Sequence, residues 1–387
     1  MEEIIRYVDR VGSNCIKWDA QEKSFGENGL LGMWVADMDF QVPACVQETL
    51  KNYVEFGVYG YTAPASGYYD AFIDWEKEKH GYEVKKEWMR YASGVVPAFN
   101  WWVQIGTQIG DAVMVLMPVY YPFHHAVKNN GRRLVACELC CEEGRYSVDF
   151  DKFEQTIVEE QVKAFILCSP HNPVGRVWKK EELTRMLEIC RKHGVFVISD
   201  EIHHDLEFDG NKHIPSATVG KYDDMLVTLT DPSKTFNLAG MKNAVVIIPD
   251  EDLRKKFDEF TMKISVTGGN TAGYLAAEAA YRGGEAWLDA VKDIIWNNYL
   301  YAAEVFRTEL PEVKISPLEG TYLMWVNFGA YLKKEEMEDF FQKKCRVAID
   351  YGSWFGGEAE TCIRINLATS RENVAECVSR IVKELKK

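Results

Sequence analysis

Short runs of apolar and β-branched residues recur through the middle of the chain, each bounded by residues that favour turns. They occupy residues 112–117, 134–137, 164–168, 195–199, 225–230 and 244–248. Runs this short, apolar at nearly every position, predict strands buried on both faces of a mostly parallel sheet. Stretches with helical periodicity lie between them, such as 180–193, which Gly194 ends. This alternation predicts an α/β fold with helices on both faces of the sheet.

The pattern changes after about residue 264. An alanine-rich stretch reads as a long helix interrupted at Gly283 and Gly284, and isolated strands and helices follow it. The predicted elements are helix 270–307, strand 322–327, helix 333–344, strand 361–366 and a last helix from Arg371. We therefore expect a large domain over 48–283 and a smaller α+β domain over 284–387, with an N-terminal segment, 1–47, packing against the smaller one.

Composition excludes several classes of partner and location. The 387 residues include 45 basic and 59 acidic side chains, a formal charge of −14, which would repel nucleic acid and anionic lipid. The N-terminal sequence MEEIIRYVDR lacks the pattern of a secretory signal, and no apolar run approaches the length of a membrane span. Ten cysteines without a dense framework fit reduced thiols. We expect a soluble cytoplasmic protein with no nucleic-acid or membrane partner.

A metal site is not expected from the cysteine pattern. Cys137, Cys140 and Cys141 form one cluster, but no second pair of Cys or His lies nearby with ligand spacing.

Lys234 stands in a polar stretch, Thr230 to Gly240, directly after a predicted buried strand. A lysine at the carboxyl end of a strand, where α/β sheets place their ligands, can form a Schiff base. Taken alone the signal is weak, because most lysines are solvated surface residues.

Asp200 ends another predicted strand, 195–199, and a carboxylate buried there needs a cationic or hydrogen-bonding partner. A protonated pyridine nitrogen would serve, and so would a helix N-terminus or a structural ion pair. His203 follows three residues later and could donate to a ring hydroxyl or simply pack in the core.

Two further segments add support. Prolines on either side of Asn172 fix its backbone just after the strand 164–168, although a simple connecting turn has the same form. Gly94, Val95 and Val96 precede Pro97 at the expected start of a helix, whose amides and dipole could hold a phosphate.

Together these segments resemble the fold type I pyridoxal-phosphate enzymes, and within them the MalY/PatB family of cystathionine β-lyase-like C–S lyases. The matching stretches run in the expected order over nearly the whole chain: KWD at 17–19, MWVADMDF at 33–40, YGY at 59–61, GVVPA at 94–98, PVY at 118–120, the Asn172 turn, SDEIH at 199–203, SKTFNLAG at 233–240, GTYL at 320–323 and RIN at 364–366. The MWVADMDF and SKTFNLAG stretches favour this family over the broader class I and II aminotransferases.

The resemblance implies roles for cofactor-binding residues. Lys234 would hold pyridoxal 5′-phosphate as a Schiff base and act as the base at the substrate α-carbon. Asp200 would pair with the pyridinium nitrogen. Tyr120 would stack on the face of the ring, and Asn172 and His203 would contact its 3-hydroxyl side. The phosphate would be held by Gly94, Val95, Val96 and Ser233.

The resemblance also implies how substrate binds. Arg364 would form a fork to the α-carboxylate, a geometry that lysine cannot supply, with Ala36 and Asn172 beside it. Tyr61 matches a tyrosine that reaches the partner subunit's site in this fold, which implies a homodimer with shared active sites.

Two positions depart from the pattern. Lys242 stands where many fold type I enzymes place a phosphate-binding arginine. Asp231 stands where the family more often has a small residue, close enough to Lys234 to alter its proton affinity.

Residue chemistry alone leaves the reaction open. A lysine, a carboxylate for the ring nitrogen and an arginine for the substrate suffice to labilise the α-proton of an amino acid. Loss of a β-thiolate would then give a thiol, pyruvate and ammonia, whereas reprotonation at the cofactor would give transamination. The resemblance favours the C–S β-lyase, with an aminotransferase as the alternative and a regulatory protein-binding partner as an alternative of another class.

Overall fold

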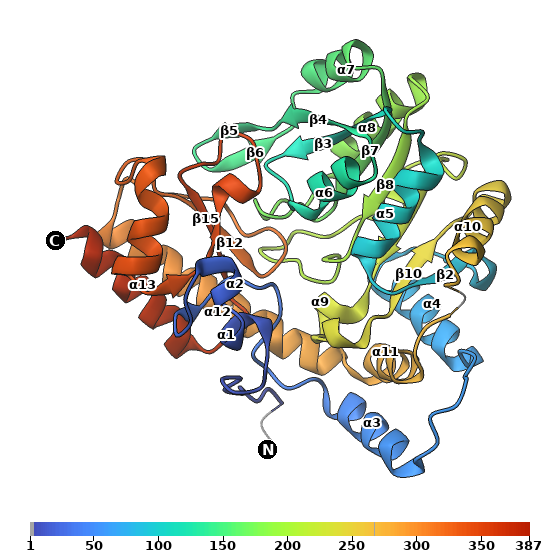
Figure 1. Ribbon diagram of the computed structural model, residues 1–387, viewed down its shortest axis with the longest axis horizontal. Helices are drawn as coiled ribbons and strands as arrows, with labels where there is room; N and C mark the ends of the chain where they lie inside the picture. Colours follow the sequence, from blue (N-terminus) through green and yellow to red (C-terminus); the bar gives the residue numbers. More distant parts are fainter. Residues whose placement is uncertain (1–3, 267) are drawn as a thin grey trace.

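A seven-stranded sheet forms the centre of the protein in the computed structural model, which describes residues 4–266 and 268–387 (Figure 1). The strands, in spatial order, are β2 (Met89–Ala92), β10 (Ala244–Ile247), β9 (Leu226–Thr230), β8 (Phe196–Asp200), β7 (Val162–Cys168), β3 (Ala112–Met117) and β4 (Arg133–Glu138). Among these seven strands, β10 alone runs in the direction opposite to the other six. The six apolar runs of the sequence are thus confirmed as strands of a mostly parallel sheet.

Helices cover both faces of this sheet. Along β3, Val113 and Val115 pack in one core cluster and Met114 and Leu116 in another, because successive side chains of a strand point to opposite faces. The first cluster includes residues of α5 (Val95–Gly106), α6 (Pro122–Asn129) and α10 (Glu251–Lys263), and the second includes residues of α7 (Phe150–Glu159) and α8 (Lys180–Lys192). Two-sided burial explains why these strands read as continuous apolar runs.

A second, four-stranded antiparallel sheet lies beside the first. Its order is β11 (Lys314–Ile315), β12 (Leu323–Asn327), β15 (Cys362–Asn366) and β14 (Asp350–Tyr351), with α12 (Glu285–Glu309) and α13 (Arg371–Leu385) packed against it (Figure 1). Helix α11 (Thr271–Gly283) ends where the sequence predicted a break. Helix α11 packs against α3 (Ala44–Phe56) and α4 (Ser66–His80).

The helix predicted over 333–344 is present, but it is not a regular α-helix. The chain forms a 3₁₀ turn, Lys334–Glu336, and then a π-helical turn, Asp339–Lys344. Phe340 and Phe341 are both buried, whereas neighbouring side chains of a regular α-helix point to different faces. The wider turn accompanies the burial of this adjacent pair.

The N-terminal segment packs beside the four-stranded sheet. It contains α1 (Ile16–Asp19), α2 (Glu22–Phe25) and β1 (Leu31–Gly32), and β1 pairs in parallel with β13 (Val347–Ala348). Two short strands, β5 (Cys140–Glu142) and β6 (Arg145–Ser147), form an antiparallel hairpin. The division at residues 47 and 283 stays a proposal.

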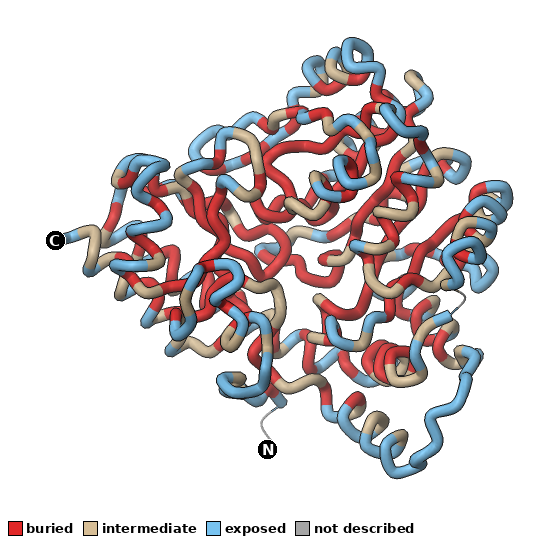
Figure 2. Tube along the Cα trace, viewed as in Figure 1, coloured by how far each residue is buried: buried red, intermediate tan, exposed pale blue. Residues whose placement is uncertain are grey.

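The chain between α3 and α4 stands out as a long exposed stretch at the lower right of the view (Figure 2). By contrast the central strands are buried along most of their length. No helix within residues 4–266 and 268–387 is long and apolar enough to cross a membrane.

Candidate active site

A cavity of about 180 Å³ opens at the carboxyl ends of the parallel strands. Its walls come from segments that directly follow β2, β3, β7, β8 and β9, which is where open α/β sheets bind ligands. Most of the residues predicted for the site line it: Ala36, Gly94, Val95, Val96, Tyr120, Asn172, Asp200, His203, Ser233, Lys234 and Lys242. Tyr61 and Arg364 are not among the lining residues.

Lys234 lies in α9 (Pro232–Phe236), a short helix that begins two residues after β9 ends. Asp231 caps this helix, since its Oδ1 accepts a hydrogen bond from the Ser233 amide over 2.7 Å. The Lys234 ammonium donates to the Ala36 carbonyl over 2.6 Å. Burial lowers the pKa of Lys234 below its usual value, and the carboxylates of Asp231 and Asp37 oppose that shift. A lysine with a lowered pKa is a better nucleophile near neutral pH.

Asp200 is the last residue of β8 and is buried. Its Oδ1 accepts one hydrogen bond, from the Ile202 amide over 3.1 Å. Burial raises the pKa of Asp200 to about 7, against the attraction of Lys234. A protonated ring nitrogen placed in the cavity would supply the cation that this carboxylate needs.

His203 is buried at the cavity wall, and its Nδ1 has no hydrogen-bond partner in the described part of the chain. Burial and the nearby charges of Lys234 and Arg364 hold the pKa of His203 well below its usual value. The imidazole is therefore neutral, and one ring nitrogen is available to a ligand hydroxyl.

The N-terminus of α5 faces the same cavity. The sequence placed the start of this helix at Pro97, but the helix begins at Val95, two residues earlier. Proline fits here because the first turn of a helix has no partner for its amides in any case. Gly94 has φ +139°, which a side chain would strain, and this turn brings Ser93, Val95 and Val96 to the cavity wall. Helix amides and dipole suit a phosphate group at this end.

Arg364 sits in β15 behind Asn172 rather than in the cavity wall. One of its terminal nitrogens donates to Asn172 Oδ1 over 2.9 Å, and the other donates to the Trp34 carbonyl over 3.3 Å and pairs with Asp350. Its Nε has no hydrogen-bond partner within the described chain. Burial raises the pKa of Asp350 to about 6, with Arg364 opposing the shift. Asp350 was not foreseen from the sequence, since its partner lies on another strand.

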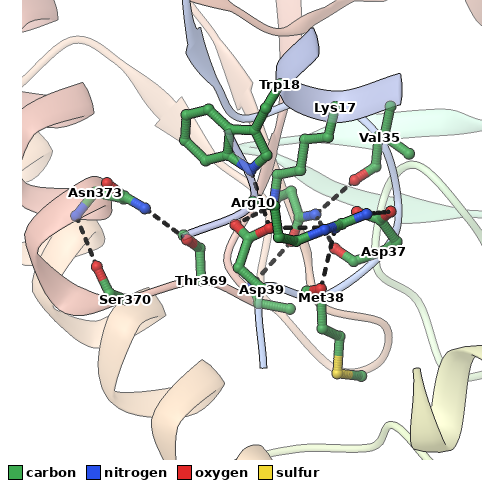
Figure 3. A network of polar contacts seen from close by, with 12 residues as sticks. Arg10, Lys17, Trp18, Val35, Asp37, Met38, Asp39, Thr369, Ser370 and Asn373 are labelled. Atoms are coloured by element: carbon green, nitrogen blue, oxygen red, sulfur yellow. Dashed lines mark hydrogen bonds and ion pairs between the residues drawn. The ribbon is translucent and has the colours of Figure 1, made fainter. Parts of the chain in front are cut away.

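The backbone of residues 34–38 passes beside Lys234, and several side chains hold it there. Tyr322 donates to the Ala36 carbonyl over 2.8 Å, and Asn366 donates to the carbonyls of Val35 and Asp37. Figure 3 shows Asp37 and Asp39 meeting Arg10, Lys17 and Trp18, which anchor the far end of this segment. Ala36 thus reaches the cavity because a network of charged residues fixes its neighbours. The sequence analysis placed Ala36 in the substrate site only through the family resemblance carried by the MWVADMDF stretch.

Comparison with known proteins agrees with this geometry. A family model described as aminotransferase class I and II matches residues 39–381. The chain belongs to this family. Within it, the chain is 40% identical to the cystathionine beta-lyase PatB of Bacillus subtilis over 375 residues, covering 96% of this chain and 97% of the relative.

Solved structures of this family extend the likeness. Cystalysin from Treponema denticola, whose crystal structure contains a pyridoxal 5′-phosphate cofactor, superposes with a TM-score of 0.95 at 36% identity, covering 100% of this chain and 99% of that one. The PLP-bound C–S lyase from Staphylococcus hominis superposes with a TM-score of 0.93 at 33% identity, covering 99% and 97%. The fold type I architecture predicted from the sequence is confirmed.

The residues present fit the cofactor of this family. The buried Asp200 carboxylate with its raised pKa, the neutral His203 with an unbonded nitrogen and the start of α5 are arranged around one cavity with Lys234. Asp231 lies beside Ser233 in the same lining as Lys242, and its carboxylate would repel a phosphate when ionised. Burial raises the pKa of Asp231 to about 6 and so favours the neutral form.

Tyr61 is fully exposed on the segment between α3 and α4. It contributes nothing to the cavity of its own chain. This position agrees with a role across a subunit interface, which remains a proposal.

Proposed function

We propose that the protein is a pyridoxal-phosphate-dependent C–S β-lyase that converts cystathionine, cysteine or a related S-substituted cysteine to a thiol, pyruvate and ammonia. One observation carries this proposal: Lys234 and Asp200 line the same cavity at the carboxyl end of the sheet. The likeness to PatB and to the C–S lyase of Staphylococcus hominis supports the choice of reaction.

Pyridoxal phosphate, when bound, supplies an electron-accepting ring that stabilises negative charge at the substrate α-carbon. Lys234 would hold the cofactor covalently, and its amine, released when the substrate amine takes its place, would accept the substrate α-proton. Asp200 would keep the ring nitrogen protonated. Tyr120 would pack on the ring, and Ser233, Lys242 and the amides that begin α5 would hold the phosphate.

Arg364 and Asn172 form the carboxylate end of the substrate site. Their mutual hydrogen bond of 2.9 Å holds the guanidinium and the amide side by side. Asp350 fixes the other side of Arg364, so that the guanidinium meets the substrate in one orientation. The Ala36 carbonyl accepts a hydrogen bond from Lys234 over 2.6 Å in the same cavity as Asn172.

An aminotransferase is the alternative reaction, because the same residues serve both outcomes. Incubation with cystathionine in the absence of a 2-oxo acid separates the two. Release of pyruvate and thiol over many turnovers is the expected result for a lyase. A single stoichiometric conversion that then stops would identify an aminotransferase and overturn the lyase proposal.

The active assembly is a homodimer in this proposal. Residues 54–61 present exposed apolar side chains, among them Phe56 at 70% exposure and Tyr61, and a patch of this kind marks an interaction site. Tyr61 from one subunit would complete the cavity of the other. Sedimentation of the holoenzyme as a monomer that retains full activity would contradict the shared site.

The cytoplasm is the proposed location. All ten cysteines are free thiols: six are buried, two are half-buried, and Cys140 and Cys141 are exposed on a surface hairpin. Thiols that stay reduced are typical of the cytoplasm.

A further inference from the structure

A cluster of histidines and carboxylates is buried between α4 and the segment that follows β8. Glu76 and His80 come from the last turns of α4, and His204 and Asp205 come from the turn after Asp200. Each of the four side chains is at most 4% exposed. We call these residues the His–Glu cluster. None of them lines the active-site cavity.

His204 directs one ring nitrogen toward the centre of the His–Glu cluster. Its Nδ1 lies 2.7 Å from the Glu201 carbonyl oxygen, which can only accept, so Nδ1 carries a hydrogen. Its Nε2 makes an ion-pair contact of 3.1 Å with Asp205 Oδ2 and lies 3.5 Å from Glu76 Oε1, and neither contact within the described residues has the geometry of a hydrogen bond.

His80 is arranged in a similar way. Its Nε2 lies 2.8 Å from Asp205 Oδ1, and its Nδ1 has no partner anywhere in the described chain. Glu76 Oε1 likewise accepts no hydrogen bond from these residues. An imidazole oriented by a carboxylate or carbonyl on one nitrogen, with the other nitrogen unbonded, is the usual arrangement of a metal-binding histidine.

The distances suit one ion. A ligand atom from each of Glu76, His80 and His204 lies within 4.8 Å of the other two. Glu76 Oε1 and His204 Nε2 lie 3.5 Å apart. Two ligand atoms of a tetrahedral zinc ion are separated by a similar distance, about 3.3 Å. His80 would have to move toward the other two residues to complete three bonds, because ligand atoms in the cluster are separated by up to 4.8 Å.

A proton on His204 Nε2 is the competing occupant. Although burial opposes it, the carboxylates of Asp205 and Glu76 raise the pKa of His204 to about 10, so an imidazolium can form without a metal. That proton would face Asp205 Oδ2 at 3.1 Å and Glu76 Oε1 at 3.5 Å, but it would leave His80 Nδ1 without a partner among the described residues. A divalent ion would bond all three residues and offset more of the buried negative charge.

We propose that Glu76, His80 and His204 bind one divalent transition-metal ion of the zinc type, with Asp205 orienting His80. The ion joins α4 to the segment after β8. Asp205 Oδ2 also accepts a hydrogen bond from Thr235, beside Lys234, over 2.6 Å, so the site supports α9 from behind.

The test measures metal in holoenzyme purified from zinc-supplemented culture. Elemental analysis after gel filtration should find about one zinc per chain. His204→Ser should reduce this to background, and the Tm difference between zinc-loaded and chelator-treated protein, a few degrees in the original protein, should vanish. Glu76→Gln, which keeps the size of the side chain, should also weaken zinc retention and serves where His204→Ser does not fold.

His193→Gln is the matched control. His193 pairs with Glu154 near the surface. Replacing His193 tests whether a histidine–glutamate pair of this kind binds zinc non-specifically, and the zinc content should stay unchanged. Zinc held at the active site would change the absorbance of the cofactor. The His204→Ser variant would also retain such zinc, which distinguishes it from zinc bound in the His–Glu cluster. Metal-free protein from the supplemented culture, or equal zinc content in the original protein and His204→Ser, would overturn the proposal and leave His204 as an imidazolium.

Discussion

The side chains of Lys234 and Tyr322 donate hydrogen bonds to the same acceptor, the carbonyl oxygen of Ala36, over 2.6 and 2.8 Å. Lys234 follows a strand of the central sheet, Tyr322 precedes a strand of the four-stranded sheet, and Ala36 belongs to the N-terminal segment. Three distant parts of the chain therefore meet on one peptide group. The proposed reacting amine is positioned by all three.

Lys234→Ala should abolish turnover and the covalent attachment of the cofactor, because no other amine replaces the one bonded to Ala36. Mass spectrometry after borohydride reduction measures the attachment. Lys242→Ala is the matched control: it removes a lysine from the same cavity but should keep the covalent link while weakening phosphate binding. Full activity in Lys234→Ala would refute the enzyme proposal.

Asp200→Asn should lower kcat/KM by about 10²- to 10⁴-fold, since a neutral amide cannot keep the ring nitrogen protonated. The covalent link to Lys234 should persist, which separates this effect from loss of the cofactor. Steady-state pyruvate release gives the rate. An unchanged kcat/KM would show that Asp200 does not pair with the ring.

Asp231→Asn should stabilise the apoenzyme above neutral pH. Burial raises the pKa of Asp231 from 3.8 to about 6, so the folded chain holds this proton more tightly than the unfolded chain does. Ionisation of Asp231 therefore lowers the free energy of unfolding. The loss is absent below about pH 4 and complete above about pH 6, where it reaches up to about 3 kcal/mol. Asparagine keeps the helix cap without the charge.

Thermal unfolding of the apoenzyme on both sides of this pH window checks the prediction. The variant and the original protein should unfold together in acid and separate as the pH rises. The variant should also bind pyridoxal phosphate more tightly, because a negative charge beside the phosphate is gone. A Tm difference independent of pH would contradict the assigned role of Asp231.

Asp39→Asn should destabilise the protein by about 3–5 kcal/mol, because it leaves the buried ammonium of Lys17 without its partner. The Lys17–Asp39 pair spans 2.7 Å and both side chains are fully buried. Asp224→Asn, which breaks the exposed pair with Arg191, should cost about 1 kcal/mol or less. Denaturant unfolding measures both. Similar losses in the free energy of unfolding for the two variants would contradict a larger contribution from the buried pair.

Several parts of the fold and the site follow from local sequence. The run 112–117 coincides with β3, and the other five runs match their strands to within two residues at each end. Lys234, Asp200 and Asn172 were each placed from the sequence at or just after the end of a predicted buried strand, where open α/β sheets bind ligands. Their grouping around one cofactor was implied by the family resemblance. The start of α5 was missed by two residues, since Gly94 rather than Pro97 sets the turn.

The sequence alone determined where the apolar strands stop and polar chemistry begins, because burial on both faces of a sheet demands unbroken apolar runs. Only the tertiary structure decided which distant residues complete the site. Asp350 meets Arg364 across two strands, Ala36 reaches Lys234 over 198 positions, and His204 meets Glu76 inside the core. These contacts depend on how separate layers pack, and no local pattern of residues encodes that packing.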